Sequence, residues 1–122
     1  MLARRILFVA AALTAGSAAV AADLLPLATG IYVLARTPCK GAPNSDTMSY
    51  WGGDNALNLS QVECKAKKVS WVGKVYTVNQ ICTEIASGSK FAAETIKITI
   101  PNATSFTLDG QSYRYCGKKV QF

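Results

Sequence analysis

From Gly30 onward, short runs of β-branched and aromatic residues alternate with Gly, Pro, Asn and Asp. This pattern is typical of antiparallel strands, and no window of the chain has the apolar periodicity of an amphipathic helix. The clearest strand spans 95–100, where Ile96, Ile98 and Ile100 alternate with polar residues and should fill one face. The pattern predicts an all-β fold, a small antiparallel β-barrel or sandwich of about seven or eight strands, because closure removes exposed strand edges.

A two-residue turn signal sets the register of one hairpin near the C-terminus. Asp109-Gly110 lies between two strand-like runs, and this dipeptide favours a type I′ turn. The register then places Phe106 opposite Tyr113, so the aromatic side of the hairpin should face the core.

Further strands are expected near three short runs: 31–35, 47–51 and 62–67. The runs 68–72 and 74–78 flank Gly73, and they predict either a second tight hairpin or one strand bent at a glycine bulge. We expect Pro101-Asn102 to stop the isoleucine strand, because proline cannot donate a hydrogen bond to a strand ladder.

Four cysteines, Cys39, Cys64, Cys82 and Cys116, are spread over this β region. Their even number, without any close Cys-x-x-Cys pair, favours two disulfides over a zinc site. Three pairings are open, and we favour Cys39 with Cys64 and Cys82 with Cys116. Each bond should contribute roughly 3–4 kcal/mol through loop closure in the unfolded chain. We expect no bound metal and no cofactor.

The first 22 residues have the organisation of a secretory signal. Arg4 and Arg5 precede the apolar run 6–13, and small residues end the segment at Ala21-Ala22. The apolar run is shorter than the roughly 20 residues of a membrane span. We therefore expect 1–22 to be a cleaved signal peptide and 23–122 to be a single exported β domain. This predicts a periplasmic protein that is not integral to a membrane.

The charged residues limit the chemistry that the protein can perform. The chain has no histidine, which excludes Ser-His-Asp triads, Cys-His dyads and imidazole metal sites. A glycosidase needs only two carboxylates, but no acid lies in a recognisable active-site motif. The acids of the exported part are Asp23, Asp46, Asp54, Glu63, Glu84, Glu94 and Asp109. We therefore expect a protein that is not an enzyme.

Two aromatic positions are candidates for either core packing or binding. Tyr50 and Trp51 precede the polar turn 52–55, an arrangement that suits sugar stacking or partner contact. The favoured interpretation is a strand end whose aromatic rings enter the core. Trp71 is likewise expected to be a core anchor.

Basic residues suggest an anionic partner. Lys65, Lys67 and Lys68 form one run, and side chains on one strand face would project together toward envelope polymers. A solvated outer face that discourages edge pairing is the favoured alternative. Export makes nucleic acid an unexpected partner. Without Arg4 and Arg5, the chain has 11 basic and 7 acidic residues, which gives a net charge of about +4.

A polar segment, Ser87-Gly88-Ser89-Lys90-Phe91, precedes the isoleucine strand, where a loop would project from the barrel. It is similar to the Ser-Gly-x-x-Tyr hallmark of the periplasmic and membrane-bound inhibitors of c-type lysozyme, with Phe91 at the tyrosine position. That family consists of small disulfide-linked antiparallel barrels, so the resemblance implies the same fold. The family's second motif, around Thr-Lys-Gly, has no clear counterpart here, and the order of elements around the loop differs.

The resemblance implies that this segment acts as an inhibitory loop. The hydroxyl of Ser87 or Ser89 and the ammonium of Lys90 would enter a muramidase cleft and bind its acidic catalytic groups. A cationic animal lysozyme would repel a basic inhibitor, so a bacterium's own lytic transglycosylase is an equal candidate. A plain surface loop with favourable turn residues is the simpler alternative.

A wider pattern also resembles a group of small exported proteins of Gram-negative bacteria, some of which are regarded as inhibitors of peptidoglycan hydrolases. The matching stretches are Gly30-Ile31-Tyr32, Thr37-Pro38-Cys39, Tyr50-Trp51-Gly52-Gly53 and Tyr113-Arg114-Tyr115-Cys116. The leading hypothesis is a non-catalytic periplasmic inhibitor of a muramidase or lytic transglycosylase. The alternative is an envelope-associated module that binds peptidoglycan, an anionic glycan or a lipid.

Overall fold

The computed structural model describes residues 23–122, and the predicted signal peptide lies outside this range. The described residues form seven antiparallel strands in one sheet of order β2-β1-β7-β6-β5-β4-β3, which confirms the all-β class. The strands are β1 Gly30–Leu34, β2 Thr47–Tyr50, β3 Val62–Val72, β4 Val75–Glu84, β5 Glu94–Asn102, β6 Ser105–Leu108 and β7 Gln111–Tyr115. A short 3-10 helix, η2 Asn44–Asp46, precedes β2. No helix within 23–122 is long and apolar enough to cross a membrane.

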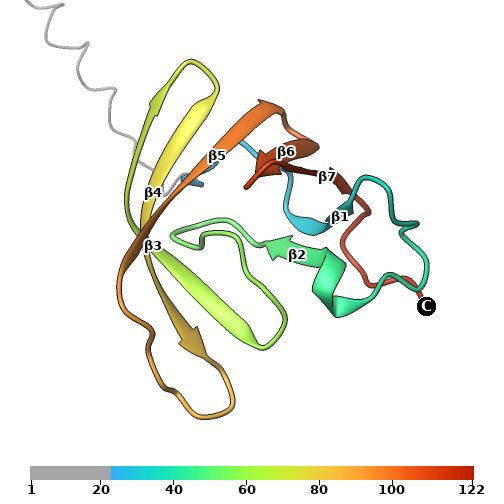
Figure 1. Cartoon of the computed structure of the whole chain (residues 1–122), viewed down its shortest axis with the longest axis horizontal. Coiled ribbons are helices and arrows are strands. Elements are labelled where there is room, and N and C mark those ends of the chain that lie inside the picture. The colour runs from blue at the N-terminus through green and yellow to red at the C-terminus, as the bar shows by residue number, and fades with distance from the viewer. Residues whose placement is uncertain (1–22) are drawn as a thin grey trace, which may run out of the picture.

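The sheet curls on itself (Figure 1). Its strand order makes β2 and β3 the two edge strands. The segment between these strands hydrogen-bonds to both of them. Asn58 exchanges two backbone hydrogen bonds with Ser49 of β2, at 2.8 and 2.9 Å. The backbone N–H of Ala56 donates to the Cys64 carbonyl of β3 at 2.9 Å. This connection satisfies part of each edge, and the half-barrel encloses one main core.

Alternating apolar residues from the strands fill the inside of the curled sheet. Ile98 and Ile100 of β5 are buried and the polar residues between them are exposed, as the alternation predicts. The Tyr32 ring packs against Phe106 and Tyr115, with ring centroids 5.2 and 5.3 Å away. Aromatic rings in tilted contact bury large areas, so this cluster forms the centre of the core.

The β6–β7 hairpin has the predicted register and turn. Leu108 pairs with Gln111 and Phe106 with Tyr113. Asp109 and Gly110 both have positive φ, 53° and 76°, as a type I′ turn requires.

The runs on either side of Gly73 form the predicted hairpin rather than one bent strand. β3 and β4 pair along their whole length, and Gly73 occupies the turn with a φ of 60°. The isoleucine strand ends within the predicted Pro101-Asn102 stop, although β5 includes both residues and so runs past the expected last residue, Ile100. A register shift between Thr99 and Asn102 accommodates the proline, which cannot join a regular ladder.

The two predicted disulfides are present, but the favoured pairing is wrong. The bonds join Cys39 to Cys116 and Cys64 to Cys82. Cys64 and Cys82 are directly opposite each other in the β3–β4 register. Cys39 and Cys116 follow β1 and β7, which are neighbours in the sheet although far apart in sequence. Strand adjacency therefore determines the pairing, and the spacing of the cysteines does not.

Candidate functional site

The segment 85–93, called the β4–β5 loop below, extends from the sheet at the lower end of Figure 1. Every residue from Glu84 to Thr95 is exposed, including Ile85 and Phe91 with exposed fractions of 61% and 52%. All five residues of the predicted inhibitory segment lie in this loop. The sequence analysis thus located a projecting loop correctly.

Hydrogen bonds within the β4–β5 loop fix its shape. The Gly88 N–H donates to the Glu84 carbonyl at 2.8 Å, and the Glu84 N–H donates to the Ser89 carbonyl at 2.9 Å. The Phe91 N–H donates to the Cys82 carbonyl at 2.9 Å, so the second half of the loop pairs with the end of β4. Gly88 has a φ of 75°, which glycine adopts without strain. An ordered loop loses little conformational entropy when it binds a partner.

The two serines of the loop have different environments. The Ser87 hydroxyl donates to Glu84 Oε1 at 2.5 Å and accepts the Ser89 N–H at 3.1 Å. Ser87 therefore shapes the turn, and its hydroxyl is not free for a partner. Within residues 23–122 the ion pairs involve Lys65 and not Lys90. Ser89 and Lys90 are consequently the polar side chains that the loop can offer to a carboxylate.

The base of the loop is held by a group that the sequence analysis missed. Gln80 is 4% exposed, and its Nε2 donates to Glu94 Oε2 at 2.9 Å across β4 and β5. The Cys64–Cys82 disulfide lies beside it on the neighbouring pair of strands. In the part of the chain that the structure describes, Gln80 Oε1 is the buried side-chain oxygen without a hydrogen-bond partner. Alternation with Val78 and Cys82 places Gln80 on the inner face, but its polar side chain does not itself indicate burial.

The structure separates Tyr50 from Trp51. Tyr50 is fully buried, and its hydroxyl accepts the Leu25 N–H at 3.1 Å and donates to the Leu25 carbonyl at 3.2 Å. Burial raises the pKa of the Tyr50 hydroxyl, and the hydrogen bond from the Leu25 backbone partly offsets this increase. Tyr50 is thus a core residue, as the favoured interpretation predicts. Trp51 is 46% exposed and does not follow it into the core.

The basic run of β3 is divided between two roles. Lys65 Nζ lies 3.3 Å from Asp54 Oδ1 and 3.8 Å from Glu63 Oε2. Lys67 lies at a register shift and Lys68 pairs with Asn79 of β4. Both lysine side chains are exposed. In the described range neither of these two lysines forms an ion pair. Two consecutive lysines of an edge strand therefore carry charges outside these ion pairs.

Trp71 is not the predicted core anchor, because it is 62% exposed. It lies opposite Tyr76 near the end of the β3–β4 hairpin, and the two rings stack with centroids 5.8 Å apart and an angle of 20°. Strand alternation gives it the same face as Val69, but the core does not extend this far along the hairpin. The sequence pattern identifies the face of a strand and not how far the core reaches.

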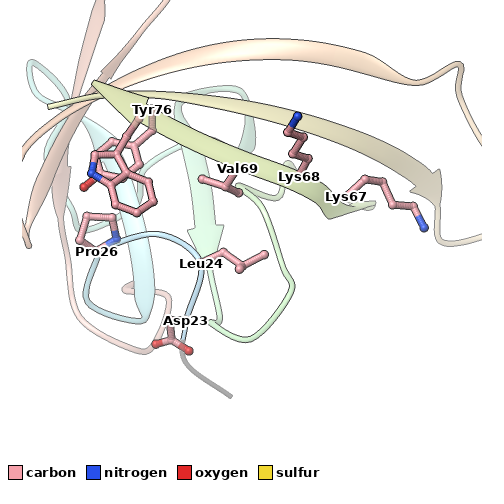
Figure 2. Close-up of a pocket in the computed structure, with 8 residues that line it drawn as sticks. Asp23, Leu24, Pro26, Lys67, Lys68, Val69 and Tyr76 are labelled. Carbon is pink, nitrogen blue, oxygen red and sulfur yellow. The ribbon is translucent and has the colours of Figure 1, made fainter. Parts of the chain in front are cut away.

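A groove of about 440 Å³ lies beside this aromatic pair, and we call it the β3 groove (Figure 2). It is lined by Asp23, Leu24, Pro26, Lys67, Lys68, Val69, Trp71 and Tyr76. One wall is the inner face of β3 and β4, and the other is the N-terminal segment of the described chain. The groove is a hollow that combines apolar and basic side chains, whereas the β4–β5 loop projects from the sheet and has Ser87, Ser89 and Lys90 as its polar residues.

Most of the described carboxylates are engaged separately, and Asp54 and Glu63 both approach the Lys65 ammonium. Asp23 accepts the Gly53 N–H, Asp46 accepts the Thr37 hydroxyl, and Asp54 pairs with Lys65. Glu84 and Glu94 bind Ser87 and Gln80 as described above. Within 23–122 no group of three or more Cys, Asp or Glu side chains is arranged to hold a metal ion.

Comparisons with protein-family models, with curated proteins and with solved structures find no match for the chain. The fold and the two surfaces are therefore interpreted from their own chemistry.

Proposed function

We propose that the protein is a non-catalytic, exported inhibitor of a peptidoglycan hydrolase, either a muramidase or a lytic transglycosylase. In this proposal the β4–β5 loop enters the hydrolase cleft and blocks it. The observation that supports it is a fully exposed loop that is held by its own hydrogen bonds and presents Ser89, Lys90 and Phe91.

The chemistry of inhibition is assigned to Lys90 and Ser89. A muramidase cleft contains carboxylic acids, and an ammonium group inserted between them forms charge-assisted hydrogen bonds that exclude water. Phe91 supplies apolar contact area beside these polar groups, because its ring is already half exposed. Ser87 keeps the turn in shape by its bond to Glu84.

An export route agrees with this function. The two disulfides stabilise the fold in an oxidising compartment. Residues 1–22 have the pattern of a signal peptide, and the predicted location is the periplasm, where peptidoglycan hydrolases act.

The proposal is tested by titrating a panel of hydrolases with the purified protein and measuring the rate of peptidoglycan lysis. The panel includes several lysozyme classes and lytic transglycosylases of a Gram-negative bacterium. We expect stoichiometric inhibition of at least one enzyme at micromolar protein. Substituting Lys90→Ala should weaken the inhibition by about tenfold or more, since it removes a charge from a desolvated contact.

A matched variant separates this contact from general charge. Lys97→Ala removes the same charge from an exposed position of β5 outside the loop and should leave inhibition unchanged within about twofold. No inhibition across the panel, or equal losses in the two lysine variants, would contradict the proposal.

A further inference from the structure

The β3 groove carries an exposed tryptophan ring whose stacking partner, Tyr76, packs against the core. Trp71 stacks on Tyr76 and still exposes 62% of its surface. A large ring left in water gives up most of the free energy that its burial would provide. Its exposure therefore points to a binding role more strongly than a single exposed leucine would. The pair forms a flat shelf along one side of the groove.

The opposite wall of the groove is held in place without any ligand. The Leu24 N–H donates to the Gly53 carbonyl at 3.3 Å, and the Gly53 N–H donates to Asp23 Oδ1 at 2.8 Å. Gly52 allows this approach, because a Cβ there would lie only 2.6 Å from Asp23 Oδ1. Figure 2 shows Pro26 on the side of the groove that faces Tyr76. Both walls are thus fixed, which lowers the entropy cost of binding.

The free charge along the groove is positive. Lys67 and Lys68 lie on β3 beyond Val69 as seen from Trp71, and Figure 2 shows Lys68 directed to the opposite side of the strand from Val69. Within residues 23–122, the ion pairs involve Lys65, and neither Lys67 nor Lys68 takes part in one. The Asp23 carboxylate is the acidic group that lines the groove, and it is engaged with the Gly53 N–H.

We propose that the β3 groove is a binding site for an acidic saccharide. The C–H face of a sugar ring would stack on the Trp71 indole, a sugar carboxylate would bind the Lys67 ammonium, and Lys68 would add positive charge at longer range. The groove volume of about 440 Å³ lies within the range of small-ligand sites. The combination of an apolar shelf with nearby cations selects for a ligand that is both amphipathic and anionic.

The charge pattern favours a saccharide over a nucleic acid, which would also stack on tryptophan. A single-stranded nucleic acid carries a phosphate at every residue and needs a continuous basic path along its backbone. Here the charged lining consists of Lys67, Lys68 and Asp23, which does not form a continuous basic path. An acidic sugar carries its charge more sparsely and matches this arrangement.

The inference is independent of the proposed inhibition. Tyr76 is near the start of β4 and the β4–β5 loop follows its end, so the two surfaces are at opposite ends of that strand (Figure 1). Substitutions at one surface therefore test one proposal at a time.

The experiment titrates the purified full chain with a hexamer of a uronic acid and follows tryptophan fluorescence and calorimetric heat. The chain has two tryptophans, and Trp51 provides the matched control for Trp71. We expect saturable binding that falls by about tenfold or more in Trp71→Ala and stays within about twofold in Trp51→Ala. If Trp71→Ala does not fold, Trp71→Leu keeps an apolar side chain while removing the flat ring.

Charge variants and other ligands complete the test. Lys67→Gln with Lys68→Gln should weaken binding and flatten its salt dependence, whereas Lys118→Gln with Lys119→Gln should change neither. The proposal is overturned by a hexamer that does not bind at millimolar concentration or by unchanged binding in the folded Trp71 variants. It is also overturned if a neutral hexose hexamer or a thymidine oligonucleotide binds the groove as tightly.

Discussion

Two hairpins of this molecule contain the same local device, a stacked aromatic pair across neighbouring strands. In β6–β7 the rings of Phe106 and Tyr113 have centroids 4.8 Å apart and an angle of 13°. In β3–β4 the rings of Trp71 and Tyr76 are 5.8 Å apart at 20°. Phe106 is 1% exposed, whereas Trp71 is 62% exposed. The same pairing therefore serves the core in one hairpin and the surface in the other.

The position of each hairpin in the sheet explains the difference. β6 and β7 have neighbours on both sides, so their inner face is covered by the rest of the half-barrel. β3 is an edge strand, and the tip of its hairpin extends past the enclosed core (Figure 1). Cross-strand stacking stabilises both hairpins, but only the β6–β7 hairpin also gains from a completely buried ring, that of Phe106.

The largest expected effect in this comparison is that of Phe106→Ala. Removing a fully buried ring from a close-packed core leaves a cavity and should lower the free energy of unfolding by about 3–5 kcal/mol. Chemical denaturation followed by circular dichroism measures the change. A loss below about 1 kcal/mol would show that the β6–β7 pair is not central to the core.

Removal of either disulfide should have the next largest effect, and the Cys64–Cys82 bond gives the smaller of the two. This bond joins the two strands of the β3–β4 hairpin and closes a loop with a sequence separation of 18. In the chain-entropy model its loss costs about 3 kcal/mol, and the Cys39–Cys116 bond, with a separation of 77, should cost more. Denaturation of the Cys64→Ser/Cys82→Ser and Cys39→Ser/Cys116→Ser variants compares them. A reversed order would contradict the loop-closure explanation.

The sequence predicted the parts of this structure that depend on local chemistry. The isoleucine alternation in β5 and the Asp109-Gly110 turn follow from side-chain period and backbone preference, and both agree with the structure. The loop with Ser89 and Lys90 was also located, because glycine and polar residues between strands indicate a turn.

The remaining features depend on contacts between distant segments. The Cys39–Cys116 bond follows from the adjacency of β1 and β7, which no local pattern encodes. Ser87 could not be distinguished from Ser89, because the difference is a hydrogen bond to Glu84 in the folded loop. The β3 groove was missed since its second wall is supplied by the segment containing Pro26, far from Trp71 in sequence.

A smaller effect is expected from Tyr32→Phe at the centre of the core. The Tyr32 hydroxyl donates to the Ala28 carbonyl at 2.6 Å and lies 3.1 Å from the Ala103 carbonyl. Its removal should cost about 1–2 kcal/mol near neutral pH.

The same residue should contribute a pH dependence. Burial, followed by the neighbouring hydroxyls of Tyr115 and Tyr50, raises the pKa of Tyr32 to about 12. The unfolded chain releases this proton near pH 10, so the contribution is fully present below pH 10 and is lost as pH rises toward 12. Denaturation between pH 9 and 12 should therefore show a shallower alkaline loss of stability in Tyr32→Phe than in the unmodified protein. Parallel curves would contradict the buried, neutral phenol.

The smallest effect on stability is expected from Trp71→Ala, and it is the sharpest test of the comparison. The substitution removes a stack but creates no cavity, because most of the ring is already in water. Cross-strand aromatic pairs at exposed positions contribute roughly 0.2–1 kcal/mol, several times less than a buried ring. Thermal and chemical denaturation should give a change below about 1 kcal/mol, against the several kcal/mol of Phe106→Ala. A large destabilisation would mean that the Trp71 shelf is a structural element of the hairpin, whereas a small one leaves its exposure unexplained by folding and available for a ligand.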